Sequence, residues 1–247
     1  MKTAAVVASA LLPVLSASAL AQGGPPLVTD DPDTPGDGKW EINVASIYSR
    51  TAGHEELAAP DIDANYGWGD YVQLKLDIPW VFARDSGEPW KAGAGTAQVG
   101  VKWRFIDEKS AGFNVSTYPQ LSWNPVPSSV ERGITAPGKE FFLPIEASTK
   151  AAGFGLDAEV GRNFVEDGPN QWALGAIAAH ECGKDVECLV ELHETVSTGE
   201  HATLFNLGVR WKLNDSFVLL GAIGHEEGTA GSDPRHALAY LGVQILR

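Results

Sequence analysis

The chain has 247 residues and a formal net charge of −14, from 32 Asp and Glu against 18 Lys and Arg. This acidic excess argues against nucleic acid as a partner, because binding to phosphates requires a basic footprint. After the first residues, no stretch approaches the roughly 18 consecutive apolar residues of a transmembrane helix. A role in a membrane would therefore have to come from strands.

Residues 1–21 have the pattern of a secretory signal peptide. Lys2 precedes an apolar run, residues 4–15, and Ala19-Leu20-Ala21 fits the small-x-small cleavage rule. The run is too short to span a bilayer by itself. We expect cleavage after Ala21 and export from the cytoplasm.

Residues 22–38 are rich in Pro, Gly and Asp, which cannot build a helix or a central strand. The acidic residues Asp30, Asp31, Asp33 and Asp37 suggest a calcium loop, but their spacing is not that of a DxDxDG loop. We therefore expect a solvated periplasmic segment that leads into a β domain formed by residues 39–247.

The clearest strand is Tyr71 to Ile78, where every second residue is apolar and the others are polar or charged. Because side chains of a strand alternate between faces, this pattern gives one apolar and one wet face. Residues 58–66 alternate in the same way, and the sequence Gly67-Trp68-Gly69-Asp70 between them is typical of a tight turn. The two segments are predicted to form a hairpin.

Further segments with strand patterns recur along the whole chain, and with the hairpin they make about twelve. They are residues 40–49, 97–105, a less regular 113–123, 141–149, 156–163, 171–179, 186–194, 203–213, 217–224 and 236–246. The connections alternate between short turns (IDEKSAG, KAAG, NDS) and long ones (VFARDSGEPWKAGAG, NPVPSSVERGITAPGK, HEEGTAGSDPR).

An even strand count, alternating short and long connections and aromatic residues near strand ends are typical of outer-membrane barrels. The alternative is a soluble periplasmic β-sandwich, which would turn its apolar face inward around a dry core. Long charged side chains on the polar face of nearly every strand favour the barrel. We predict an all-β fold, an antiparallel transmembrane β-barrel located in the outer membrane and in contact with its lipid.

Three stretches carry a resemblance to a known family: LVTDDPDTPGDGKWEINVA, PDIDANYGWGDYVQLKLDIPW and GTAQVGVKWRF. The sequence resembles a proteobacterial family of outer-membrane barrels labelled transporter-like or after the MetA pathway of phenol degradation. The resemblance is close through Phe105 and afterwards rests on strand rhythm. It implies a barrel with a transport role, inserted by the barrel insertion machinery, and no catalytic residues. That machinery commonly recognises a terminal aromatic, whereas this chain ends in Arg247.

The two cysteines, Cys182 and Cys188, lie in the sequence CGKDVEC. The spacing does not match CxxC chemistry, and an exported chain meets an oxidising environment. A disulfide across a hairpin turn is favoured; free thiols are the alternative.

No catalytic motif, metal-ligand spacing or cofactor motif is present. A barrel enzyme that cleaves lipids would need a histidine on the outer wall, and His193 is the best candidate. However, Glu191 lies on the same, inward face. A hydrogen-bonded interior histidine is therefore favoured, and we expect no enzyme activity.

Charged residues of both signs are predicted to line the lumen. One interpretation is a passive channel or uptake component whose charges select small solutes. The alternatives are a structural barrel plugged by ion pairs and a lipid-modifying enzyme. Twelve strands lie between the eight that side chains fill and the roughly sixteen that leave a channel, so the strand count does not decide. The predicted lumen residues are Asp61, Asp63, Lys75, Asp77, Lys102, Arg104, Glu146, Asp157, Glu159, Glu191, His193, Arg210 and Lys212.

Overall fold

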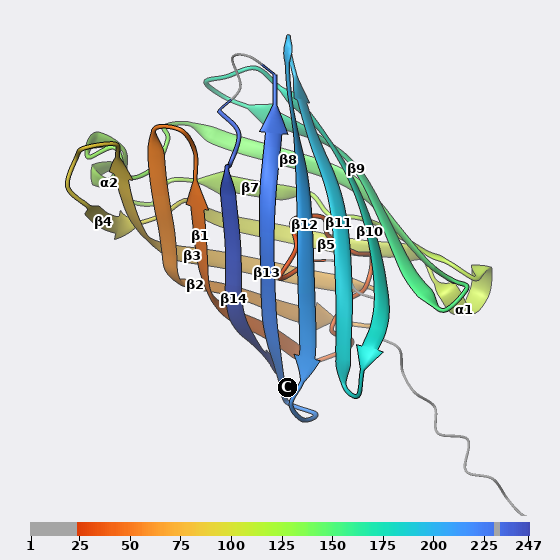
Figure 1. The fold of residues 1–247 in the computed structure, drawn as a ribbon. Coiled ribbons are helices and arrows are strands. Elements are labelled where there is room, and N and C mark those ends of the chain that lie inside the picture. Colours follow the sequence, from red (N-terminus) through yellow and green to blue (C-terminus); the bar gives the residue numbers. More distant parts are fainter. Residues whose placement is uncertain (1–23, 230–232) are drawn as a thin grey trace, which may run out of the picture.

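The strands of the computed structural model close into an antiparallel barrel, in which the first strand pairs with the last (Figure 1). The structure describes residues 24–229 and 233–247, so the predicted signal peptide lies outside the described residues. Consecutive strands pair with each other around the wall, as in an up-and-down barrel. The predicted fold class is confirmed: the wall has twelve strand positions, with two additional short strands.

Within the described residues the strands are β1 Trp40–Arg50, β2 His54–Trp68, β3 Val72–Asp85, β4 Lys91–Ala94, β5 Ala97–Ile106, β6 Asn114–Thr117, β7 Gln120–Trp123, β8 Lys139–Ala151, β9 Phe154–Val165, β10 Gln171–Gly183, β11 Val186–Ser197, β12 Glu200–Lys212, β13 Phe217–Gly228 and β14 Ala237–Leu246. Two short helices, α1 Glu108–Ala111 and α2 Pro127–Glu131, lie in connections. No helix in this part of the chain is long and apolar enough to cross a membrane.

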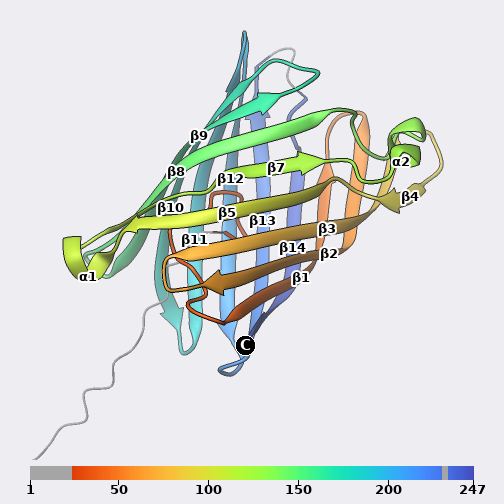
Figure 2. The ribbon, with the colours of Figure 1, turned by 180° about the vertical axis from the view of Figure 1, so that it is seen from behind.

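The structure departs from the predicted strands in two places, and the first has a local cause. The irregular segment 113–123 forms β6 and β7, which share one place between β5 and β8 (Figure 2). Pro119 lies at the break, where a residue without an amide donor cannot continue the ladder. The second departure is the connection predicted after Ile78, part of which forms strands. β3 continues to Asp85, and the short β4 pairs with its second half.

The polarity of the barrel is inverted relative to a soluble protein. Val190, Leu207 and Ile223 lie side by side on β11, β12 and β13, and they are 56%, 57% and 66% exposed. Across the same strands, Glu191 and Asn206 are almost completely buried. A soluble sandwich has the opposite arrangement, so that alternative is wrong. A wall with so many exposed apolar side chains requires a lipid-like surrounding.

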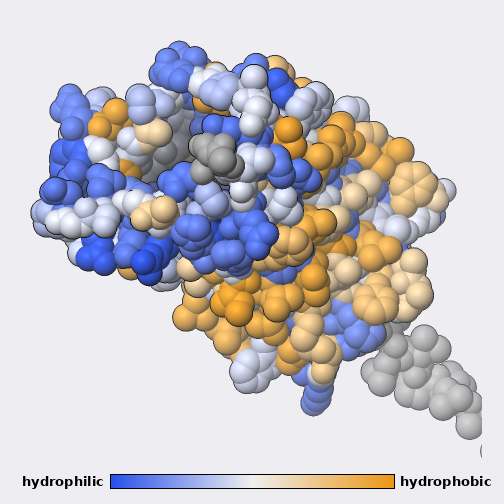
Figure 3. Space-filling view, turned by 45° about the horizontal axis from the view of Figure 1, so that its top comes forward, coloured by the Kyte–Doolittle hydropathy of each residue, from blue (hydrophilic) through white to orange (hydrophobic). Residues whose placement is uncertain are grey.

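The longer connections gather at one end of the barrel, with α2 and β4, and α1 lies at the opposite end (Figure 1). β2 has 15 residues and spans roughly 50 Å, or roughly 35 Å along the barrel axis if it tilts by 45°. The apolar band of such barrels is only about 25 Å tall. The strands therefore project beyond it, and Figure 3 shows hydrophilic residues gathered at the long-loop end and hydrophobic residues on the wall.

The turn between β10 and β11 is closed by a disulfide between Cys182 and Cys188, whose Cα atoms are 5.8 Å apart. Asp185 lies between them with a positive φ of 60°, as a tight reversal requires. The sulfur atoms link neighbouring strands at the short-turn end and leave no free thiol among the described residues.

We predict that Leu207→Arg destabilises the folded barrel by about 2–4 kcal/mol, because it places a charge on the wall near the middle of β12. Unfolding in lipid vesicles, followed by the mobility shift between unboiled and boiled samples, measures this cost. Ser216→Arg, in the exposed turn after β12, is the matched control and should have little effect. Equal effects of the two variants would contradict a lipid-facing wall.

Candidate functional site

The N-terminal segment, of which the structure describes residues 24–38, runs inside the barrel (Figure 1). Thr29 is fully buried, and Leu27 and Asp31 are only 7% and 6% exposed. A turn at its inner end is closed by a hydrogen bond from the Gly24 amide to the Thr29 carbonyl (2.7 Å). The expectation of a solvated segment is therefore wrong. Its composition does prevent helix and strand, but the barrel wall supplies partners that water would otherwise supply.

Glu191 and His193 of β11 hold the inner turn of this segment. The Glu191 carboxylate accepts hydrogen bonds from the backbone amides of Val28 (3.0 Å) and Thr29 (2.5 Å). The Thr29 hydroxyl lies 3.2 Å from Nδ1 of His193, which is only 6% exposed. On β10, a Cβ at Gly175 would lie 2.1 Å from the Thr29 hydroxyl oxygen, so glycine makes room for the segment. His193 is thus a hydrogen-bonded interior histidine, as the sequence favoured.

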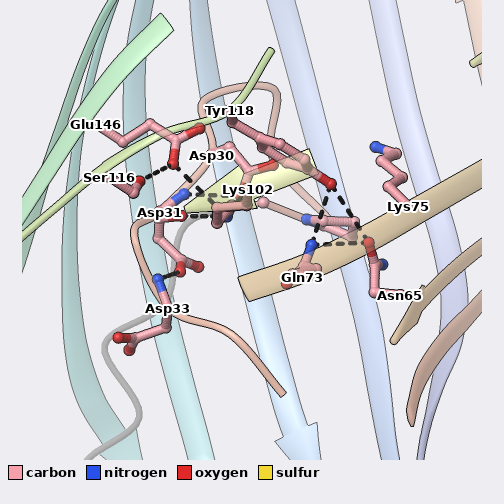
Figure 4. A network of polar contacts seen from close by, with 12 residues as sticks. Asp30, Asp31, Asp33, Asn65, Gln73, Lys75, Lys102, Ser116, Tyr118 and Glu146 are labelled. Carbon is pink, nitrogen blue, oxygen red and sulfur yellow. Dashed lines mark hydrogen bonds and ion pairs between the residues drawn. The ribbon is translucent and has the colours of Figure 1, made fainter. Parts of the chain in front are cut away.

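Lys102 of β5 binds the segment from another part of the wall (Figure 4). Its buried ammonium lies 2.9 Å from Asp30 Oδ1 and 3.7 Å from Glu146 Oε2, and it donates to the Asp31 carbonyl. The ammonium also lies 4.6 Å from the centre of the Tyr118 ring. Burial would raise the pKa of Asp30, but the charges of Lys102 and Lys75 and the hydrogen bonds from Lys102 and the Asp31 amide together outweigh burial and lower this pKa. The pair is therefore an ion pair inside the barrel.

Two arginines bind the segment on either side of this turn. Arg210 of β12 donates from Nη2 to the Pro25 carbonyl (2.9 Å), and its Nη1 lies 3.5 Å from the Glu187 carboxylate. Arg104 of β5 forms an ion pair with Asp33 at 2.8 Å. Strands far apart in the sequence are thereby joined through the segment.

The segment leaves the interior beside the turn between β2 and β3. Gly36 packs so closely there that a Cβ at Gly67 would lie 1.8 Å from the Gly36 carbonyl oxygen. Asp37 accepts a hydrogen bond from the amide of Gly69 (2.9 Å), which has a φ of +68°. The glycines of this turn therefore serve both the tight reversal and the close approach of the segment.

A layer of polar side chains adjoins Lys102 (Figure 4). The Gln73 amide donates to Asn65 Oδ1 (2.8 Å) and to the Tyr118 hydroxyl (3.0 Å). Asn65 in turn donates to Asp63 (3.1 Å), which also accepts from Asn43 (3.4 Å) and lies 3.8 Å from the ammonium of Lys75. These bonds join β2, β3 and the break between β6 and β7 into one interior network.

The structure brings almost all of the predicted lumen residues into the interior. Lys212 is the exception: it is the last residue of β12, is exposed, and pairs with Asp215 in the following turn at 2.9 Å. Alternation along β12 predicts that Lys212 is on the same face as Arg210, but it does not predict where β12 ends. The residues found in the interior are Asp61, Asp63, Lys75, Asp77, Lys102, Arg104, Glu146, Asp157, Glu159, Glu191, His193 and Arg210.

The sequence analysis missed the interior residues that come from irregular structure. Asp30, Asp31 and Asp33 were assigned to a solvated segment, and Tyr118 lies in the break of a strand that was only coarsely predicted. Asp30 and Asp33 form ion pairs with Lys102 and Arg104, about seventy residues further along the chain. Because the partners are so far apart in the sequence, no local pattern predicts these ion pairs.

Two cavities and a narrow space follow one another inside the barrel. The outer cavity, between β2, β3, β5, β7 and residues 133–136, has a volume of about 700 Å³. The inner cavity shares Asp61 and Asp77 with it, has about 390 Å³ and reaches Pro25 and Leu27. Beyond it, the space between the segment and Lys102 holds only about 30 Å³, roughly one water. The N-terminal segment thus lines the smallest of these three spaces.

No protein-family model matches this sequence, and no curated protein matches it either. Among solved structures, the barrel is similar to the COG4313 outer membrane channel from Pseudomonas putida F1, with a TM-score of 0.71 and 10% identity over 90% of this chain and 100% of that chain. It is also similar to the KdgM porin (TM-score 0.57, 10% identity, 82% of this chain and 98% of that chain) and the NanC porin (0.56, 10%, 83% and 98%). At these identities the likeness establishes the fold, that of porin-like outer-membrane barrels.

We predict that a cysteine at position 29 is protected as long as the segment stays in place. Thr29→Cys should react slowly with a bulky maleimide in the folded protein. Adding Glu191→Ala removes the acceptor of two backbone amides and should speed the reaction by about tenfold or more. Ser216→Cys, in an exposed turn, is the control and should react fast with or without the Glu191 change. Equally fast labelling at 29 and 216 in the parent background would contradict the buried position.

Proposed function

We propose that the protein is a passive channel of the outer membrane for small solutes, with a bore narrowed by its own N-terminal segment. The observation that carries the proposal is the sequence of cavities along the interior. They are wide at the long-loop end and close to the size of one water beside Lys102. A barrel with a purely structural role would not require a cavity at its long-loop end.

The outer-membrane location is supported by the inverted polarity of the wall together with the predicted export signal. In barrels of this kind the short turns face the periplasm and the long loops face outward. The outer cavity would then open to the exterior, and the N-terminal segment would lie toward the periplasmic side. Outer-membrane lipid and the barrel insertion machinery are the partners that this assignment implies.

We also infer kinship with the transporter-like family named after the MetA pathway of phenol degradation. The stretches that carry the resemblance are those that meet in the interior. Asp30 and Asp33 come from the first stretch, and their partners Lys102 and Arg104 come from the third.

An enzymatic role is less well supported. A histidine that acts on lipid would have to reach the outer wall, but His193 is buried and bonded to Thr29 in the interior. Incubation with phospholipid or lipopolysaccharide should therefore give no products. Turnover that disappears in His193→Ala would favour the enzyme instead.

The inner cavity predicts a preference for cations. It is lined by five carboxyl groups and only two permanent cations: Asp30, Asp61, Asp63, Asp77 and Glu159 against Lys75 and Arg235. In planar bilayers under a KCl gradient, the protein should conduct with a reversal potential that favours K⁺.

Removing one cation from this cavity tests the assignment. Lys75→Gln should raise the K⁺/Cl⁻ permeability ratio by about twofold, since lumenal charge sets the local potential. Lys212→Gln removes the same charge from an exposed position at the end of β12. This variant is the matched control, and its permeability ratio should change little. Absence of conductance in protein that still shows the mobility shift on boiling would contradict the channel and favour the plugged structural barrel.

A further inference from the structure

The outer cavity has one largely apolar side. Ala58, Val81, Ala83 and Ile134 form a buried cluster there, against which Ile47 packs. Residue 134 comes from the loop after α2, which folds inward over β2 and β3. Beside this cluster, Ile47, Pro79 and Ala136 line the cavity and keep part of their surface accessible, so the mouth has an apolar surface next to its hydrophilic residues.

The charge of the outer cavity has one sign. Glu56, Asp61 and Asp77 line it, and among the described residues no lysine or arginine does. His54 is the one basic side chain in its lining, and its Nδ1 lies 2.9 Å from Asp85. A solute that enters from the long-loop end meets negative charge beside an apolar wall.

Asp61 and Asp77 form a pair of carboxyl groups, and neither makes an ion pair with a lysine or arginine of the described residues. Asp61 is only 9% exposed, and its side chain lies within hydrogen-bonding reach of that of Asp77. One oxygen of Asp77 is buried with no hydrogen-bond partner. The ammonium of Lys75 lies 3.8 Å from Asp63 and makes no ion pair with either residue. Two adjacent carboxyl groups require either a shared proton or a cation between them.

The position of this pair connects the two cavities. Asp61, Asp77, Ile47 and Gln98 line both the outer and the inner cavity. Any solute that passes from one cavity to the other must therefore pass the two carboxyl groups. The apolar cluster lies on the outer side of this point.

We propose that the outer cavity binds a small organic cation, with its ammonium group at Asp61 and Asp77 and its apolar body against Ile47 and Pro79. This deepens the channel proposal and rests on it for the direction of transport. A neutral or anionic solute would leave the carboxyl pair without a counter-charge. A metal ion fits less well, because the described residues contain no group of three or more His, Cys, Asp or Glu suited to hold one.

Calorimetric titration of the folded protein in detergent, with three probes of similar shape, tests the site without requiring conduction. The probes are 2-phenylethylammonium, neutral 2-phenylethanol and anionic 3-phenylpropionate. The ammonium should bind saturably and at least about tenfold more tightly than the alcohol, and the carboxylate should not bind. Equal affinity for ammonium and alcohol would overturn the proposal.

Variants separate the two parts of the site. Asp61→Asn combined with Asp77→Asn should weaken ammonium binding by about tenfold or more and leave the alcohol unchanged, since only the charge is removed. Ile47→Ala should weaken both probes alike. Asp185→Asn combined with Asp215→Asn removes the same number of charges from exposed turns at the opposite end and is the matched control. Ammonium affinity that survives the double substitution would overturn the site.

The outcome for the channel is read separately in planar bilayers. Ammonium binding by protein that conducts no current would overturn the passive channel and leave the binding site in place. Conduction without preferential ammonium binding would overturn the site and leave the channel in place. Each variant is first shown to be folded by its mobility shift on boiling.

Discussion

The alternation of side chains along the strands is the constraint on which the rest of the structure depends. In each strand, every second side chain lies on the outer, apolar face of the wall. Polar and charged side chains of the strands are therefore confined to the interior. Closure by pairing of β1 with β14 removes the sheet edges and satisfies the backbone. The charged groups in the interior must then be paired there, because a buried charge without a partner is costly.

The N-terminal segment meets this requirement. Lys102 and Arg104 face inward from β5, and their nearest acidic partners include Asp30 and Asp33 rather than only residues of neighbouring strands. Glu191 binds backbone amides of the same segment. A barrel of twelve positions is wider than its own side chains fill, and the segment takes up part of the excess. What remains is open at the long-loop end.

The sequence was sufficient for features with a local period. The twelve strand positions and the facing of Asp63, Lys102 and Glu191 follow from period-two alternation, which is read within a few residues. The disulfide turn at Cys182 was likewise predicted from short-range spacing and an oxidising compartment, and the structure contains it.

Features without a local period could not be predicted in this way. The burial of the N-terminal segment depends on cations that follow it by some seventy residues, as in the pair of Asp30 and Lys102. The exposure of Lys212 depends on where β12 leaves the wall, which alternation does not specify. The pairing of β4 with β3 depends on a long connection folding back. Each is decided by tertiary contacts that a strand pattern does not contain.

The central claim is that the N-terminal segment narrows an otherwise open bore. Single-channel conductance of the parent protein, compared with a variant lacking residues 24–34, tests it most directly. We expect that the variant still folds into a heat-shiftable barrel and conducts several-fold more current than the parent, because the segment that fills part of the bore is removed. Unchanged conductance in a folded variant would contradict it.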